Sequence, residues 1–220
     1  EIRDTGLLRQ SLTIVRRNLI HIKRMPEMLL DVTIQPVMFV LLFAFVFGGS
    51  IAVGGSPAGY REWLMAGIMA QTIAFASFIV AVGLTADIDK GIVDRMRSLP
   101  INPAAVLVGR SISSLLHSSI GIVIMSLTGL AIGWRIRDGF FEAVLAYALL
   151  LLWGFAMIWL GILVGSSLRS VEAVNGLMFA TMFPITFLAN TFAPTENMPT
   201  ALRAIAEWNP LSSLVQAGRP

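Results

Sequence analysis

The residue types that most often do chemistry in proteins are scarce in this chain of 220 residues. It has two histidines, His21 and His117, two lysines, Lys23 and Lys90, and no cysteine. Neither lysine follows a glycine or precedes a serine or threonine, so the phosphate-binding loop GxxxxGK[ST] of ATPases is absent. The HExxH spacing of metalloproteases and the GxSxG turn of serine hydrolases are absent too. We therefore expect no enzyme activity, no catalytic residue, no metal site and no cofactor in this chain.

One charged segment has the composition of a docking surface for a partner protein. It runs from Asp87 to Pro100, between two long apolar stretches. At helical spacing its apolar residues share one face, which predicts a short amphipathic helix at a membrane edge. Apolar side chains would anchor a partner and charged ones would fix its register, although a solvated loop whose charges only set topology is the alternative. The expected docking residues are Asp87, Ile88, Ile92, Asp94, Arg95, Met96, Arg97 and Leu99.

Three polar residues within apolar stretches are candidates for lining a translocation path. They are Gln35, Gln71 and His117. Polar groups at membrane depth need partners and often mark a substrate path. His117 lies 14 residues after Pro103, which corresponds to about 21 Å along a helix. For His117, a structural hydrogen bond between helices is an equal alternative.

The elements that must position these residues are five stretches without Asp, Glu, Lys or Arg, at 32–60, 63–86, 111–134, 143–168 and 173–195. A helix needs about 20 residues to cross a hydrocarbon core of about 30 Å. With 56% hydrophobic residues and a mean hydropathy of +0.78, the chain is predicted to be an all-α integral membrane protein. We expect one polytopic helical bundle over residues 1–220, with five spans at 28–48, 62–86, 104–134, 142–168 and 172–191. A soluble domain would leave its five buried helices almost no polar face.

Two further segments are predicted to lie at the membrane surfaces. Residues 6–24 combine an apolar stripe with a basic row, which is typical of an interfacial helix on anionic lipid. Residues 192–212 contain several prolines and predict short, broken helices at the outer surface. The basic residues of the interfacial helix are Arg9, Arg16, Arg17, Lys23 and Arg24.

The distribution of basic residues predicts the orientation in the membrane. Eleven of the 16 lie on the side of the N-terminus and of residues 87–100, and five lie on the other side: Arg61, Arg135, Arg137, Arg203 and Arg219. Because basic residues favour the cytoplasmic side, we expect the N-terminus and residues 87–100 to be cytoplasmic. The net charge of +3 is then a matter of topology and does not predict a nucleic-acid partner.

Two pairs of glycines have the GxxxG spacing that lets helices approach closely. They are Gly129 with Gly133 and Gly161 with Gly165. The spacing serves contacts within one chain as well as between two chains. We favour contacts between helices of this chain over a dimer seam.

Taken in order along the chain, several motifs resemble those of the permease subunit of type-2 ABC exporters, and most closely those of the daunorubicin-resistance group of drug and lipid exporters. The motifs are the basic N-terminal helix, Asp87-x-x-x-Gly91 followed by Arg95 and Ser98-Leu99-Pro100-Ile101, Pro194-x-x-x-x-Pro199, and Asn209-Pro210-Leu211-Ser212. The resemblance covers nearly the whole chain.

The resemblance implies a six-span permease with a cytoplasmic coupling helix at about Asp87 to Leu99 and outer re-entrant helices between the fifth and sixth spans. We expect the sixth span to be missing from this sequence. Two permeases, identical or homologous, would rest on two cytoplasmic ABC ATPase subunits, which bind the ATP and Mg²⁺. The protein would be a multi-pass protein of a bacterial plasma membrane that exports a hydrophobic or amphiphilic drug or lipid. A polysaccharide or glycolipid exporter of the same general family is the nearest alternative, and a non-transporting membrane anchor or a channel is the alternative from another class.

Overall fold

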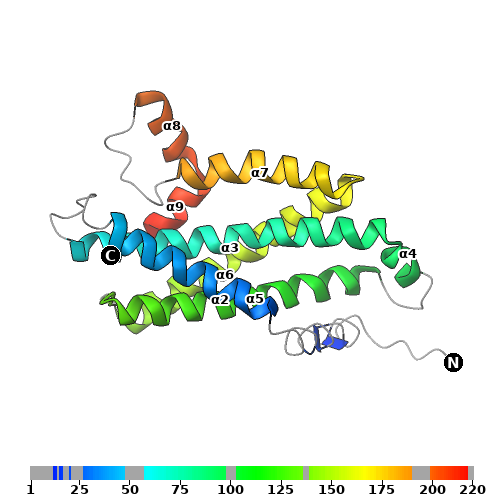
Figure 1. The fold of residues 1–220 in the computed structure, drawn as a ribbon, viewed down its shortest axis with the longest axis horizontal. Helices are drawn as coiled ribbons and strands as arrows, with labels where there is room; N and C mark the ends of the chain where they lie inside the picture. Colours follow the sequence, from blue (N-terminus) through cyan, green and yellow to red (C-terminus); the bar gives the residue numbers. More distant parts are fainter. Residues whose placement is uncertain are drawn as a thin grey trace.

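The computed structural model describes residues 12–13, 15–16, 20, 27–47, 57–97, 103–135, 139–189 and 199–217. Every regular element in these ranges is a helix, which confirms the all-α prediction for them. Five long helices form a bundle (Figure 1): α2 (Glu27–Leu42), α3 (Pro57–Asp89), α5 (Pro103–Ala131), α6 (Phe140–Ser167) and α7 (Val171–Phe187). A π-helix, η1 (Phe43–Phe47), continues α2.

Short helices cap the two ends of the bundle. Helix α4 (Ile92–Arg97) lies at one end, while α8 (Thr200–Trp208) and α9 (Pro210–Ala217) lie at the other (Figure 1). We refer to these as the α4 end and the α9 end.

Within the described residues, three helices are long and apolar enough to cross a membrane: Trp63–Asp89, Ala104–Ala131 and Phe140–Ser167. Two shorter apolar helical stretches, Thr33–Val46 and Val171–Phe187, accompany them. Large apolar side chains such as Phe179 and Phe183 stand exposed on the outside of the bundle. Such a surface suits a hydrocarbon solvent, in which each helix satisfies its own backbone hydrogen bonds.

Helix α3 is the centre of the bundle and packs most extensively against α6. Small residues make this contact close. A Cβ atom on Gly161 would lie 2.3 Å from the carbonyl oxygen of Ser77, and one on Gly165 would lie 2.5 Å from that of Ala81. Within the same seam, the Thr85 hydroxyl donates a hydrogen bond of 2.8 Å to the carbonyl oxygen of Gly165. The prediction that this GxxxG pair serves contacts within the chain is confirmed.

In the other GxxxG pair, only one of the two glycines packs against another of the described helices. Gly129 packs against Met65, since a Cβ atom there would lie 2.6 Å from the Met65 methyl carbon. Gly133 instead lies beyond the end of α5 with φ +101°, where an added Cβ atom would meet none of the described residues within 4 Å. The amide of Trp134 bonds back to the carbonyl of Gly129 at 2.9 Å, so Gly133 supplies the left-handed conformation that ends the helix.

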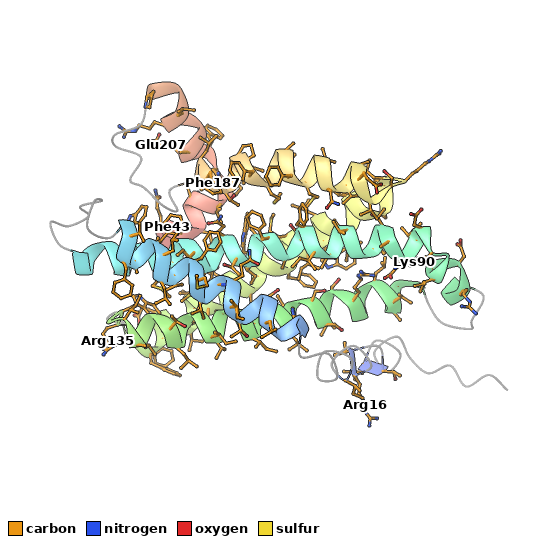
Figure 2. The ribbon with its side chains drawn as sticks, viewed as in Figure 1. Arg16, Phe43, Lys90, Arg135, Phe187 and Glu207 are labelled. Atoms are coloured by element: carbon orange, nitrogen blue, oxygen red, sulfur yellow. The ribbon has the colours of Figure 1, made fainter. Side chains whose placement is uncertain are left out.

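The predicted interfacial helix lies largely outside the described residues. Of residues 6–24, the structure describes Leu12, Thr13, Val15, Arg16 and Ile20, all helical. The Arg16 side chain is exposed and points away from the bundle (Figure 2). Arg9, Arg17, Lys23 and Arg24 lie outside the described residues.

Candidate functional site

The charged segment at the α4 end is divided by a tight turn. Helix α3 continues through Asp89, and α4 begins only at Ile92. The amide of Lys90 donates to the carbonyl of Ala86 at 3.1 Å, and that of Gly91 donates to Ile88 at 2.9 Å. Gly91 has φ +67°, a conformation that glycine adopts without steric cost. The expected single helix from Asp87 to Leu99 is therefore wrong at this point, because Gly91 ends one helix before the next begins.

Most of the predicted docking residues that the structure describes lie at the surface of this end. Ile88 and Ile92 are 38% and 39% exposed, and Asp94 and Arg95 are exposed on α4. Lys90 lies in the turn between the helices (Figure 2). The structure thus presents apolar and charged groups together. The side chains of Met96 and Arg97, and the whole of Leu99, lie outside the described residues.

Asp87 differs from the other predicted docking residues because its carboxylate is engaged within the chain. It forms an ion pair with the guanidinium of Arg110 on α5. The side chains of Arg110 and Asp87 are 24% and 33% exposed. The charge pattern of the sequence assigned Arg110 only to the basic side of the membrane, and it gave no signal that Arg110 pairs with a residue 23 positions earlier. The pair joins the end of α3 to the first part of α5.

The three predicted path residues lie on three different helices. Gln35 is exposed on α2, Gln71 is 7% exposed on α3, and His117 is half buried on α5. The helices that carry them pack against one another. Their role in a translocation path stays a prediction.

Serines near His117 bond to their own helix. The hydroxyls of Ser113 and Ser119 donate to the carbonyls of Gly109 and Leu115, each at 2.7 Å. A serine that bonds the carbonyl four residues earlier satisfies its own polar group. Each of these two hydroxyls thus has an acceptor on its own helix.

At the α9 end, Asn209 joins two helices in a way that the sequence did not predict. Its side-chain amide donates to the carbonyl of Ile185 near the end of α7 at 2.6 Å. Its side-chain oxygen accepts a hydrogen bond of 2.9 Å from the amide of Leu211. Asn209 is 7% exposed, so both of its polar atoms have partners where burial requires them. The motif Asn209-Pro210-Leu211 thus starts α9 and fixes it to α7.

The apolar bundle, with polar and charged groups gathered at its ends, defines a multi-pass helical membrane protein. A family model described as ABC-2 type transporter matches residues 9–219, nearly the whole chain, so the chain belongs to the ABC-2 type transporter family. Within that family it is the membrane permease subunit of an ABC transporter, as the order of its motifs predicted.

Several curated relatives are similar over most of the chain. The "Daunorubicin resistance ABC transporter permease protein DrrB1" of Streptomyces coeruleorubidus is 30% identical over 209 residues, which cover 95% of this chain and 73% of the relative. The "Putative transport permease ycf38" of Cyanophora paradoxa is 22% identical, over 95% of this chain and 72% of the relative. The "Probable doxorubicin resistance ABC transporter permease protein DrrC" of Mycobacterium tuberculosis is 20% identical, over 84% of this chain and 67% of the relative.

Proposed function

We propose that this chain is the permease half of an ATP-driven exporter of hydrophobic or amphiphilic cargo, and that a separate ATPase subunit docks at the α4 end. The observation that carries the docking is α4 itself. It is a short helix outside the long bundle, with exposed Asp94 and Arg95 on it and exposed Ile88 and Ile92 beside its turn. Such a mixture of apolar anchors and charges is typical of specific protein contacts.

Docking at this end requires it to face the cytoplasm, where ATP is available. The bias of basic residues supports that orientation, because eleven of 16 lie on the side of residues 87–100. Five spans are supported by the three long apolar helices together with the two shorter ones. We place the protein in a bacterial plasma membrane, where its basic N-terminal segment would lie on anionic lipid.

Energy for transport would come from the partner, because this chain has no phosphate-binding loop. The ATPase subunits would bind ATP and Mg²⁺, and a second permease, identical or homologous, would complete the pathway. ATP-driven closure of the ATPase subunits would displace α4 and shift the bundle between inward-open and outward-open arrangements.

The cargo is proposed to be a drug or a lipid. The helices contain few ionisable residues, which disfavours a small ion as cargo. Two of the relatives are named for resistance to daunorubicin and doxorubicin. Labelled daunorubicin, a labelled phospholipid and a labelled polysaccharide would therefore be compared in vesicles that contain the complex and ATP.

The docking proposal is tested by replacing both Asp94 and Arg95 with alanine. We expect the amount of ATPase that co-purifies from the native membrane to fall by about tenfold or more. Such a loss corresponds to about 1.4 kcal/mol or more of binding free energy, as expected when the residues removed are hot spots of an interface. ATP-dependent uptake of daunorubicin or lipid by inverted vesicles should fall in parallel.

The matched control removes another opposite-charge pair at the far end of the bundle. Arg203 and Glu207 form an exposed ion pair of 2.7 Å on α8, and their double alanine variant should bind the ATPase normally. Normal binding and uptake by the Asp94 and Arg95 variant would overturn docking at α4. If the unmodified protein binds the ATPase but its complex moves no cargo on addition of ATP, a membrane anchor would be favoured.

A further inference from the structure

The ion pair between Asp87 and Arg110 lies where α4 joins the rest of the bundle. Asp87 is four residues before Gly91, the residue that ends α3 and whose carbonyl accepts a hydrogen bond of 3.1 Å from the amide of Arg95 in the first turn of α4. Arg110 lies two turns into α5, which starts at Pro103. The pair therefore lies next to the turn that leads into α4, and it joins α3 to another long helix, α5.

Helix α3 is shaped to receive the guanidinium of Arg110. One turn before Asp87, Gly83 leaves space that a side chain would fill, since a Cβ atom there would lie 2.6 Å from an Arg110 Nη atom. Gly83 and Asp87 are four residues apart and so share a face of α3. The guanidinium of Arg110 thus lies against Gly83 on α3 and pairs with the carboxylate of Asp87 one turn further on.

The charges of this pair are partly withdrawn from water. The Arg110 side chain is 24% exposed and that of Asp87 is 33% exposed. A pair in such a setting is screened less than one at a free surface, and the loss of one member leaves the other charge poorly compensated. The two helices consequently favour one position relative to each other.

Among the described helices, α4 packs chiefly against α3, and α3 also packs against α5. A displacement of α4 would consequently move the end of α3 first. On its other side, α3 is joined to α6 by close backbone contacts at Ser77 and Ala81. The ion pair is a polar contact that joins this end of α3 to α5.

We infer that Asp87 and Arg110 are positioning residues that carry the displacement of α4 to α5 during transport. This inference rests on the proposed docking of an ATPase at α4. It assigns Asp87 to a role inside the permease, while Asp94 and Arg95 contact the partner. The pair transmits movement by staying formed, so that α3 and α5 move together.

The test uses the full complex with its ATPase in vesicles and the variants Asp87→Asn and Arg110→Gln. The expected result is that the ATPase still co-purifies in the normal amount and hydrolyses ATP. The cargo moved per ATP hydrolysed should fall by about tenfold or more, a loss within the range typical of coupling between sites. Normal transport per ATP in both variants would overturn the inference.

Two further variants separate a lost link from a damaged fold. Gly83→Leu displaces the guanidinium without removing either charge, and it should reduce transport per ATP in the same way. Residues 1–220 contain no cysteine, so Asp87→Cys combined with Arg110→Cys introduces a pair of thiols at this contact for a short crosslinker. Crosslinking should restore transport to that double variant, and crosslinked complex without transport would contradict transmission by a permanent link.

Failure of this inference can be told apart from failure of the proposed function. If the ATPase binds at α4 and the ion-pair variants transport normally, only the inference fails. If the Asp94 and Arg95 variant binds the ATPase normally, the proposed docking fails, and the inference fails with it.

Discussion

Helix α3 meets α6 along one seam and α5 along another, and the two seams differ in their contacts toward the α4 end. At the α6 seam, Gly161 and Gly165 bring backbone against backbone. At the α5 seam near the α4 end, the side chains of Arg110 and Asp87 reach toward each other and form an ion pair. Close packing leaves no room for a larger side chain, whereas the ion pair depends on two charged side chains that single substitutions can neutralise. The comparison indicates that backbone contact fixes α3 against α6, whereas the contact of α3 with α5 includes an ion pair that mutation can remove without creating a steric clash.

The largest effect is expected from Gly161→Leu in the α6 seam. Because even its Cβ atom would lie 2.3 Å from the Ser77 carbonyl oxygen, α3 and α6 would have to separate. We expect a destabilisation of about 3 kcal/mol or more and much less monodisperse protein, measured by size-exclusion chromatography after heating in detergent.

The control for that variant is Gly176→Leu on α7. Gly176 is exposed, and a Cβ atom added there would meet no neighbouring group of the described residues within 4 Å. Its replacement should therefore leave the melting temperature unchanged. Equal melting temperatures for the two variants would show that the α6 seam is not the rigid contact described above.

An intermediate effect on stability is expected from Asp87→Asn in the α5 seam. The pair is partly buried, so its loss should cost about 1–2 kcal/mol, between the values typical of exposed and buried ion pairs. The melting temperature of the purified permease should fall by less than for Gly161→Leu. A larger fall than for Gly161→Leu would reverse the order of the two seams.

The smallest effect is expected from Thr85→Val, which removes the hydrogen bond to the Gly165 carbonyl but keeps the shape of the side chain. Hydrogen bonds between membrane helices are typically worth about 0.6 kcal/mol. The change should therefore lower the melting temperature only slightly, as measured by the same heating assay. Thr181→Val is the control, because the Thr181 hydroxyl bonds to carbonyls of its own helix, α7, and the residue is exposed. If Thr85→Val lowered the melting temperature as much as Gly161→Leu, this hydrogen bond, rather than backbone contact, would hold α3 and α6 together.

Much of the fold could be predicted from the sequence because a membrane helix has a simple signal. Each of the five stretches without charged residues contains a described helix. Pro36 and Pro184 occur within these apolar stretches and lie inside α2 and α7. The spacing of Gly161 and Gly165 indicated close packing, although only the structure identifies α3 as the neighbour.

What could not be predicted depends on distances across the bundle. In the sequence, Arg110 is one of several charges that set topology, and its pairing with Asp87 appears only when α3 and α5 lie side by side. Asn209 is part of a motif, and its bond to the Ile185 carbonyl depends on where α7 ends. Amphipathic spacing continues across Gly91 and so predicted a helix there, but the backbone conformation of Gly91 ends α3. Periodicity reports which face a residue occupies and does not report which neighbour faces it.

The seam between α3 and α6 also bears on how the protein is made. Phe140, the first residue of α6, follows Asp89, the last residue of α3, by 51 residues, so α3 leaves the ribosome well before its main partner exists. During that interval the hydroxyls of Ser77 and Thr85 can bond within their own helix, to the carbonyls of Ala74 and Ala81. Helix α3 can therefore stay in the lipid bilayer before α6 is inserted, without an unsatisfied hydroxyl at either position. Biogenesis of this permease would then have a late assembly step. In that step the newly inserted α6 packs its glycines against α3, which is already in the bilayer.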